Sequence, residues 1–333
     1  MNILYHIATL RPQTPEVEAV SQDVAALQES FGGDPVYVNP NPGSPIYVPR
    51  LLFGLHRLKE IRAQKADLHH FFNPDPFPFP YLRMLRAPVV YAVTCGVGEG
   101  RINRTFLSRM DAITVSDERS LGRLESRGLG NVFLVQPGID TARFTQTPRP
   151  LRSEIRLMVG SAPWVRSQFK TKGVNALLEA ARQLPHLHLI FLWRGVLSEE
   201  MERRVDHMGL EDRVQVLNTI VDVNEVLAGV HASITLASEP DIVKAYPHSL
   251  LESLAAGKPV LVSRAIPMSL YVEEKGCGVV VERLSLRSLI AAVENLVTEY
   301  ETLSRTTQQL DEQDFSRERM LLSFQRLYEQ VLA

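Results

Sequence analysis

A loop, a helix start and a carboxylate follow one another in residues 244–263, KAYPHSLLESLAAGKPVLVS. Pro247 cannot continue a helix and restricts the residue before it, so residues 244–248 are predicted to form a loop. Ser249 is a suitable N-cap for the next helix, and Glu252 falls in its first turn. Helix N-terminal N–H groups bind phosphate, and a carboxylate binds hydroxyl groups. The stretch therefore predicts a site for a phosphate beside a polyol, which describes a nucleotide sugar.

The apolar pattern around this stretch is that of an α/β protein. Leu250, Leu251 and Leu254 have helical spacing, and Gly257 with Pro259 ends the helix before a buried strand. Runs with helical spacing separate most of the predicted strands, which favours two doubly wound parallel sheets. The predicted strands are 2–8, 36–38, 66–70, 88–93, 111–116, 131–136, 155–159, 187–193, 214–217, 232–236, 260–262 and 279–282.

The length of 333 residues, 45% of them hydrophobic, suits two domains that each bury a core. The segment 145–151 is polar and rich in proline, as a linker should be. We therefore predict domains at 1–148 and 149–315. A final helix at 316–333 follows, with an apolar stripe at Met320, Phe324, Leu327 and Val331.

Composition excludes several classes of protein. The net charge of −2 gives no support for nucleic acid as a partner. Cys95 and Cys277 are the only cysteines, which provides no disulfide framework and no zinc spacing. The loop after the first strand lacks the glycine pattern of dinucleotide-binding dehydrogenases. The start of the chain lacks a signal peptide, and no apolar run is long enough to span a membrane, so we expect a cytoplasmic protein.

The stretch 244–263 resembles the nucleotide-sugar motif of retaining glycosyltransferases of the GT-B fold, family 4 (group 1). That motif reads Glu-Gly-Phe-Pro-Asn-Ser-Leu-Leu-Glu-Ala-Met-Ala-Cys-Gly-x-Pro-Val-Val. Residues 249–251, Glu252, Gly257 and Pro259 match it, whereas Lys244 stands in place of its first glutamate. The resemblance implies two facing Rossmann-like domains with an active-site cleft between them and a final helix that crosses back to the first domain.

Two further segments carry the resemblance. Residues 137–140, Pro-Gly-Ile-Asp, followed by Phe144, are similar to the family's Asn-Gly-Val-Asp-x-x-x-Phe at the domain boundary. Lys172 with Gly173 fits the lysine that holds the donor diphosphate in relatives. Arg166 is our choice for the accompanying arginine, with Lys170 as its competitor. Residues 194–195 keep only part of the family's Gly-x-Gly turn.

The resemblance implies a set of site residues and no resident cofactor or metal, since cations of the chain can do the work of Mg²⁺. Glu252 should orient the ribose hydroxyls, and residues 218–221 should hold the base by backbone groups. The predicted catalytic residues are Lys172, Arg166 and Lys244; the donor-binding residues are Glu252, Ser249, Leu250, Lys170, Asn218 and Ile220; the acceptor-side residues are His69, His70 and Gly96.

The function that the resemblance implies is transfer of a hexose-type sugar from a nucleotide diphosphate to an acceptor hydroxyl, with retention of configuration, in glycan biosynthesis. A non-catalytic nucleotide-sugar binder, such as a partner subunit, is the alternative. It is favoured by Lys244, by Cys95 where relatives often have histidine, and by the missing Gly-Gly pair after the first strand. A sugar epimerase of the same architecture is a third interpretation, which the motifs at 137–144 and 244–263 disfavour.

The expected partners are a nucleotide-sugar donor and a glycan, lipid-linked or small-molecule acceptor. One stretch carries five arginines against the single acid Glu99, and a solvated surface is their default interpretation. The minority interpretation is peripheral contact with a phosphate-rich or membrane surface. These arginines are Arg83, Arg86, Arg101, Arg104 and Arg109.

Lys244 leaves three roles open. The lysine can turn to the diphosphate, or it can pair with Glu239 or Asp241 and be structural. It can also meet a carboxylate on the donor sugar, as in a nucleotide-linked uronic acid. Lysine only donates hydrogen bonds, so it cannot replace the family's glutamate as an acceptor.

Overall fold

The computed structural model describes residues 1–333 apart from 13–17, 42–43, 45, 194–195 and 312. The chain forms two compact units, one of Met1–Gly138 with Ser316–Ala333 and one of Ile139–Phe315. This boundary lies after Gly138, whereas the sequence placed it after Pro148. The proline-rich segment belongs to the second unit because buried Lys258 donates to the Thr147 carbonyl and Tyr300 donates to the Arg149 carbonyl at 2.8 Å.

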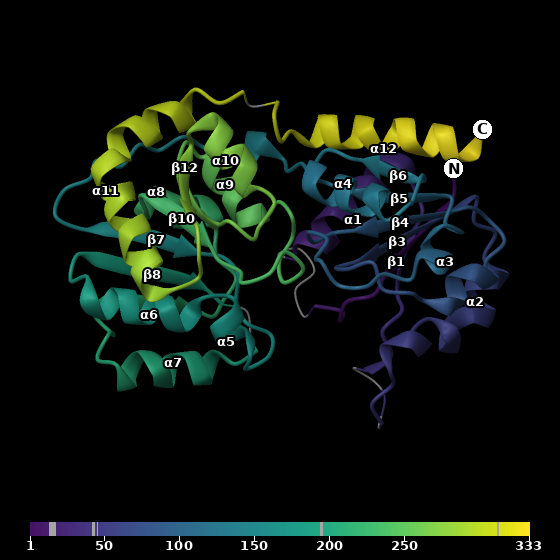
Figure 1. The fold of residues 1–333 in the computed structure, drawn as a ribbon, viewed down its shortest axis with the longest axis horizontal. Helices are drawn as coiled ribbons and strands as arrows, with labels where there is room; N and C mark the ends of the chain where they lie inside the picture. Colours follow the sequence, from purple (N-terminus) through teal and green to yellow (C-terminus); the bar gives the residue numbers. More distant parts are fainter. Residues whose placement is uncertain (13–17, 42–43, 45, 194–195, 312) are drawn as a thin grey trace. The chain divides into compact units, whose positions relative to one another are not determined.

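The first unit is a parallel six-stranded sheet in the order β2-β1-β3-β4-β5-β6 (Figure 1). Its strands are β1 (Ile3–Ile7), β2 (Asp34–Tyr37), β3 (Leu68–Asn73), β4 (Val89–Val93), β5 (Ala112–Val115) and β6 (Val132–Leu134). Its helices are α1 (Ala19–Phe31), α2 (Leu58–Ala63), α3 (Arg104–Leu107), α4 (Glu118–Ser126) and α12 (Arg317–Leu332), with 3₁₀ turns η3 (Arg50–Leu52), η4 (Leu55–Arg57) and η5 (Pro80–Met84).

Helix α12 completes the first unit although it comes last in the chain. Its predicted apolar stripe packs with α1 on one face of the sheet, where Tyr328 meets the edge of the Phe31 ring. The other face buries Phe53, Tyr81 and Phe106, among others. Both faces of the sheet are therefore covered, as a parallel sheet requires.

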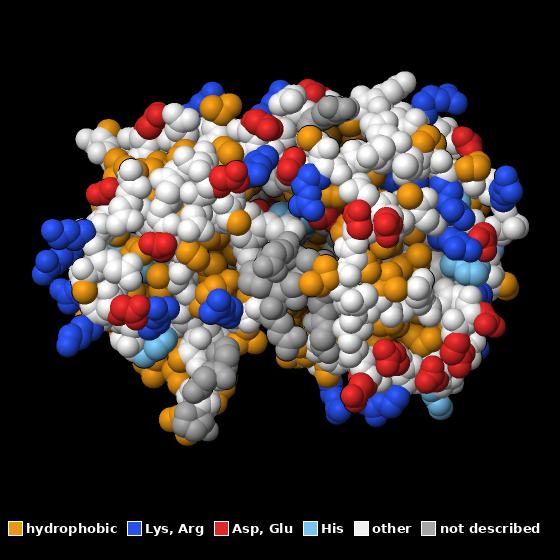
Figure 2. Space-filling model, turned by 180° about the vertical axis from the view of Figure 1, so that it is seen from behind, with side chains coloured by type: hydrophobic (Ala, Val, Ile, Leu, Met, Phe, Trp, Pro, Cys, Tyr) orange, Lys and Arg blue, Asp and Glu red, His pale blue; other side chains and the backbone are white. Residues whose placement is uncertain are grey.

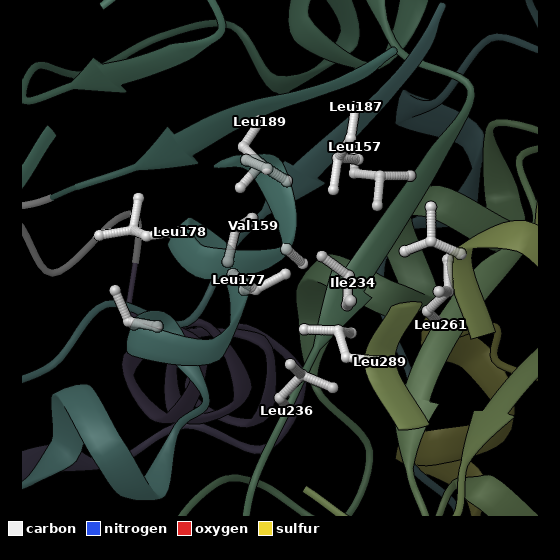
Figure 3. Packing of buried hydrophobic residues seen from close by; sticks show 14 of the residues in the cluster. Leu157, Val159, Leu177, Leu178, Leu187, Leu189, Ile234, Leu236, Leu261 and Leu289 are labelled. Carbon is white, nitrogen blue, oxygen red and sulfur yellow. The ribbon is translucent and has the colours of Figure 1, made fainter. Parts of the chain in front are cut away.

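The second unit is also a parallel six-stranded sheet, in the order β12-β11-β10-β7-β8-β9. Its core joins the sheet to α6 and α11, as Figure 3 shows for Leu177, Ile234 and Leu289. Its strands are β7 (Ile155–Val159), β8 (Leu187–Leu192), β9 (Val214–Leu217), β10 (Ala232–Thr235), β11 (Val260–Ser263) and β12 (Gly278–Val281). Its helices are α5 (Gln168–Thr171), α6 (Val174–Gln183), α7 (Ser198–His207), α8 (Val223–Gly229), α9 (His248–Ala255), α10 (Ser269–Lys275) and α11 (Leu286–Gln308), with the 3₁₀ turn η6 (Thr141–Arg143).

The predicted fold class is confirmed, because every predicted strand occurs and both sheets are parallel. Two local predictions are wrong. Strand β3 does not end at His70 but continues to Asn73, because Phe71 and Phe72 also bury their rings. Residues 161–171, before Lys172, were predicted to form a basic loop, but they contain a short helix, α5. No helix in the described part of the chain is both long and apolar enough to cross a membrane.

Three neutral histidines lie inside the first unit. His6 Nε2 lies 3.0 Å from His69 Nδ1, and His6 Nδ1 lies 3.1 Å from the Tyr81 hydroxyl. On the other face, His70 Nδ1 lies 2.7 Å from the Tyr328 hydroxyl of α12. Burial lowers the pKa of His69 to about 4 and that of His70 to about 3. These rings therefore join core elements as uncharged groups.

Acid should destabilise the unit that holds these histidines. Their folded-state pKa values lie below the ordinary 6.5, so the unfolded chain binds more protons as the pH falls through 6.5 toward 4. Above 6.5 both states are neutral and no stability is lost. Each histidine can account for up to ~2 kcal/mol of loss by about pH 5. We expect His70→Phe to lose less stability than the native chain between neutral and mildly acid pH, measured by urea unfolding with circular dichroism. Equal losses would contradict this origin of acid sensitivity.

Candidate functional site

The second unit has a topological switch point between β7 and β10, because the chain turns to β8 on one side and to β11 on the other. Ligands of such sheets bind outside the carboxyl ends of the strands at the switch. Gly160 follows β7, Thr235 ends β10, and Ser249 lies against both. The Ser249 hydroxyl is 3.3 Å from that of Thr235, and a Cβ built on Gly160 would lie 2.4 Å from Ser249 Cβ. The first turn of α9 thus sits directly on the switch.

Helix α9 begins at His248, two residues earlier than an N-cap at Ser249 predicts. Pro247 is its N-cap, and the Pro247 carbonyl accepts from the N–H groups of Leu250 at 3.0 Å and Leu251 at 3.1 Å. The prediction that Ser249 caps the helix is therefore wrong, and Glu252 lies in the second turn. Leu250 is fully buried in the core and its N–H is already donated. Ser249 and Glu252 are three residues apart, so they share a helix face.

Helix α6 begins at the same switch point. Gly173 adopts a left-handed φ of 69°, and a Cβ there would lie 2.7 Å from Leu236, which follows β10. Lys172, just before it, is 7% exposed, and its Nζ donates to the Ala162 carbonyl at 3.0 Å. Packing against β10 therefore fixes both the start of α6 and a buried ammonium close to the end of β7.

Lys244 forms a hydrogen bond with His248, which was not among the partners predicted for it. Its Nζ lies 2.9 Å from His248 Nε2, and His248 is the first residue of α9. An ammonium can only donate, so Nε2 of His248 accepts and that imidazole carries its proton on Nδ1. The contact places a cation beside the start of α9.

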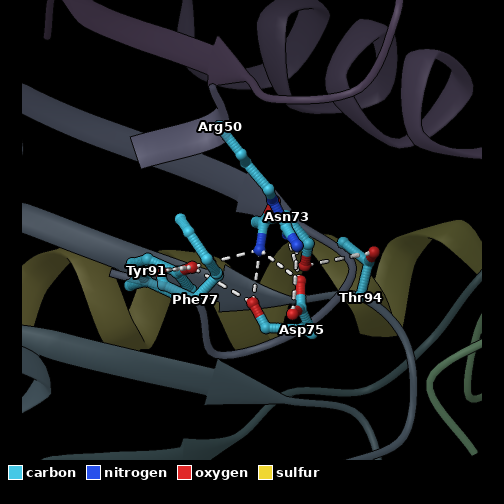
Figure 4. Close-up of polar contacts among 6 residues, drawn as sticks. All are labelled: Arg50, Asn73, Asp75, Phe77, Tyr91 and Thr94. Atoms are coloured by element: carbon cyan, nitrogen blue, oxygen red, sulfur yellow. Dashed lines mark hydrogen bonds and ion pairs between the residues drawn. The ribbon is translucent and has the colours of Figure 1, made fainter. Parts of the chain in front are cut away.

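In the first unit the corresponding switch lies between β1 and β3, and a polar network surrounds the end of β3 (Figure 4). Arg50 donates to Asp75 at 3.1 Å and to the Asn73 side chain at 2.9 Å. Asn73 Nδ2 donates to Asp75 Oδ1 at 3.0 Å and lies 3.2 Å from the Tyr91 hydroxyl. Tyr91 donates to the Phe77 carbonyl at 2.6 Å. The network fixes the segment after β3.

The same network keeps two charged groups in contact with solvent. The Arg50 side chain is 34% exposed and that of Asp75 is 32% exposed. The guanidinium also stacks over the Phe77 ring, with Cζ 4.4 Å from the centroid. Burial raises the pKa of Tyr91 well above its ordinary value, so the phenol stays protonated and keeps donating. A carboxylate and a guanidinium held in this way can bind hydroxyl groups of a ligand.

Residues 155–313 match the family model described as glycosyl transferases group 1. The matched segment is just under half of the chain, lies within the second unit and contains the β7–β10 switch. The lipopolysaccharide glucosyltransferase WaaG of Escherichia coli (strain K12) is 29% identical over 121 residues, which cover 35% of this chain and 31% of that protein. The chain thus matches about a third of the length of this relative.

Solved structures extend the likeness to both units. Sucrose-phosphate synthase from Thermosynechococcus elongatus has a TM-score of 0.74 at 16% identity, covering 99% of this chain and 99% of that chain. HepE of Anabaena in complex with UDP has a TM-score of 0.70 at 16% identity, covering 99% of this chain and 100% of that chain. The chain has the GT-B fold.

Within this GT-B fold the predicted catalytic and donor-binding residues separate into three groups. Lys172, Ser249 and Lys244 lie by the β7–β10 switch. Asn218 and Ile220 follow the edge strand β9, which is separated from β7 at the switch by β8. Ile220 is 67% exposed. Arg166 precedes α5 and Lys170 lies within it, and both are exposed. The partial turn at 194–195 lies outside the described residues.

The predicted acceptor-side histidines are at the wrong end of their strand. His69 and His70 lie at the start of β3, 4% and 0% exposed, whereas ligands of this fold bind at carboxyl ends. Asn73 and Asp75 do lie at that end; they belong to the segment 73–80, for which a plain connection and an acceptor-side wall were both possible interpretations, but they were not among the predicted site residues. Their signal was the proline- and aromatic-rich run that follows the strand.

The remaining predictions concern smaller features. Gly96 is buried shortly after the end of β4, at the carboxyl edge of the sheet. Cys95 beside it is also buried. Across the described residues, no three His, Cys, Asp or Glu side chains gather closely enough to hold a metal ion.

The close contact of Gly160 with Ser249 gives a direct test. Gly160→Ala should force the first turn of α9 away from the sheet, at a cost of ~1–3 kcal/mol, and should weaken nucleotide binding. Thermal unfolding can be followed by fluorescence, because Trp164 and Trp193 both lie in the second unit. Gly229→Ala is the matched control, since a Cβ there meets nothing within 4 Å. Equal effects of the two changes would contradict the tight contact.

Proposed function

We propose that this chain is a retaining glycosyltransferase that moves a hexose-type sugar from a nucleotide diphosphate to an acceptor hydroxyl. The observation that carries the proposal is that Lys172 and the first turn of α9 both lie at the β7–β10 switch. The glycosyl transferases group 1 match at 155–313 supports it. An anion-binding helix start and a buried ammonium at a switch point suit a diphosphate.

The leaving diphosphate is stabilised electrostatically in this proposal. A diphosphate at the start of α9 meets the N–H groups of His248 and Ser249 first, since that of Leu250 is donated to Pro247. An ammonium has three donors, so Lys172 can hold the Ala162 carbonyl and a phosphate oxygen together. Negative charge on the phosphate grows as the glycosidic bond breaks, so these groups favour the transition state.

The rest of the donor is assigned to groups around this point. Glu252, on the Ser249 face of α9, accepts from the ribose hydroxyls. Asn218 and Ile220 hold the base at the end of β9. Arg166 and Lys170 add exposed cations near the phosphates. HepE, a structural neighbour, is described in complex with UDP, which makes UDP the first nucleotide to test.

Retention follows from attack on the same face of the sugar that the diphosphate leaves. The acceptor oxygen bonds the anomeric carbon, the bond to the phosphate oxygen breaks, and that phosphate oxygen takes the acceptor proton. No side chain serves as a nucleophile, and the cations of the chain serve in place of a metal.

The acceptor is assigned to the first unit, as a glycan, a lipid-linked or a small-molecule hydroxyl. Asp75 and Arg50, at the carboxyl end of β3, are the groups we assign to its hydroxyls in place of the buried His69 and His70. A cytoplasmic location and peripheral membrane contact belong to the same proposal.

Lys244 is assigned to the diphosphate. Its contact with His248 holds the ammonium beside the N-terminus of α9, where a phosphate would lie. A donor sugar with a carboxylate, or a purely structural pairing, would use the same lysine differently. The alternative of a non-catalytic nucleotide-sugar binder is not favoured, because the family match covers the donor-binding segment.

Incubation with labelled UDP-, GDP- and ADP-sugars tests the proposal. Release of nucleotide, by transfer to an acceptor or by slow hydrolysis, supports a transferase. Retention is supported if an α-linked donor gives an α-linked product. Binding without turnover would support the non-catalytic alternative, and a changed donor sugar would support an epimerase.

Lys172→Ala should reduce both donor affinity and turnover, with turnover falling by about 10²-fold, because it removes a donor whose value grows in the transition state. Lys170→Ala is the matched control two residues away, on an exposed position. Steady-state kinetics with the preferred donor provide the measurement. A larger loss of turnover in Lys170→Ala than in Lys172→Ala would show that Lys170, and not Lys172, is the lysine that holds the diphosphate.

Lys244→Glu should abolish turnover by repelling the diphosphate. If Lys244 instead binds a carboxylate on the donor sugar, the same change should shift preference from acidic toward neutral donors. The measurement is turnover across a panel of neutral and uronic-acid donors. Full activity with an unchanged donor would contradict both functional roles and leave the structural one.

A further inference from the structure

Exposed apolar side chains gather on one part of the first unit, in the turns η3 and η4, the residues before them and the end of η5. We call this the η3–η5 surface. Each of these side chains is more than a third exposed, although most are the type that a core would take. They are Ile46 (72%), Tyr47 (79%), Leu51 (45%), Leu52 (45%), Leu55 (38%) and Met84 (45%).

These side chains point outward because the inner face of the same segment is already filled. Phe53 is 5% exposed and Ile61 is 0% exposed, both within the core of the unit. Gly54, between η3 and η4, has a left-handed φ of 80°, and a Cβ there would lie 2.4 Å from the Tyr81 ring of η5. This close approach presses the segment onto η5, so the outward leucines have no room to turn inward.

The segments that carry the apolar side chains are also rich in cations. Residues 46–65 contain five Lys or Arg and one acid, Glu60, and η5 adds Arg83, with Arg86 just after it. Arg50 is paired with Asp75 and Arg57 with Glu60. The exposed cations are Lys59, Arg62, Lys65, Arg83 and Arg86. Figure 2 shows blue cationic groups beside orange apolar ones on the side of the picture that holds the first unit.

We propose that the η3–η5 surface docks on an anionic lipid bilayer, with its apolar side chains in the interface and its cations at the headgroups. Apolar side chains flanked by Lys and Arg on a segment that lies along the protein suit an interface rather than a span. Lys and Arg stems cover apolar surface while their charges stay in water, and an anionic leaflet attracts them. The proposal does not depend on sugar transfer.

Only some of the five arginines that the sequence suggested for membrane contact lie at the η3–η5 surface. Arg83 and Arg86 lie at η5, which packs beside η3. The Arg104 guanidinium lies over Gly128, where a Cβ would be 2.8 Å from Cζ, so Arg104 is held near the end of α4. Arg83 and Arg86 therefore belong to the docking surface, and Arg104 does not.

Vesicle co-sedimentation of the full chain tests the proposal. Binding is expected to vesicles of phosphatidylcholine with phosphatidylglycerol, but at least tenfold weaker to phosphatidylcholine alone, and it should weaken with added salt. No binding to the anionic vesicles would overturn the proposal and leave an acidic protein face as the occupant.

Two sets of variants separate the apolar and ionic parts. Changing Leu51, Leu52 and Leu55 to Gln should weaken binding at least tenfold at every salt concentration. Leu322→Gln with Leu332→Gln is the matched control, since these leucines are 50% and 43% exposed on α12 of the same unit. Arg83→Gln with Arg86→Gln should weaken binding mainly at low salt, and Arg104→Gln should not.

Tyr47→Trp gives a readout that does not depend on loss of binding. Its emission should shift to the blue on anionic vesicles and should be quenched by brominated lipid. Thermal unfolding of each variant confirms that it folds. Unchanged emission of Tyr47→Trp on bound vesicles, or full binding by the triple leucine variant, would contradict the assigned surface.

Discussion

The structure of the proposed donor site depends on one close contact, that of Ser249 with Gly160 and Thr235. Strand β7 must be followed by a residue without a side chain, Gly160, for the first turn of α9 to reach the sheet. Because that turn sits on the switch between β7 and β10, its N–H groups are aimed at the place where the strand order reverses. Lys172 reaches the same place, since Gly173 packs α6 onto the end of β10. A buried ammonium and a helix start are thereby brought to the same switch point.

At the switch point of the first unit, between β1 and β3, charged side chains remain exposed instead of buried. The network of Arg50, Asn73, Asp75 and Tyr91 satisfies the polar groups at the end of β3 and leaves a carboxylate and a guanidinium in solvent. At the other end of β3, His69 and His70 are buried and their pKa values are lowered by burial. One strand thus carries neutral histidines that join core elements and, after its last residue, charged groups that can meet a ligand.

Much of the fold and part of the site could be predicted from the sequence. Buried parallel strands are continuous apolar runs, so they could be predicted, and Lys172 with Gly173 was identified by its resemblance to the family's Lys-Gly pair. The end of β3 was misplaced because His69 and His70 are polar by type, although burial keeps them neutral within the strand. Arg50 could not be paired with Asp75 from spacing, since the two residues are 25 positions apart in the chain, with α2 and β3 between them. The bond from Lys244 to His248 depends on where α9 begins, and its N-cap is Pro247, two residues earlier than the predicted Ser249.

The central claim is that a nucleotide diphosphate binds at the β7–β10 switch. A crystal structure of the full chain soaked with UDP, and with GDP and ADP as alternatives, tests it most directly. The account predicts phosphate oxygens within hydrogen-bond distance of the N–H groups of His248 and Ser249 and of Lys172 Nζ. A diphosphate bound elsewhere on the chain, with the start of α9 empty, would contradict it.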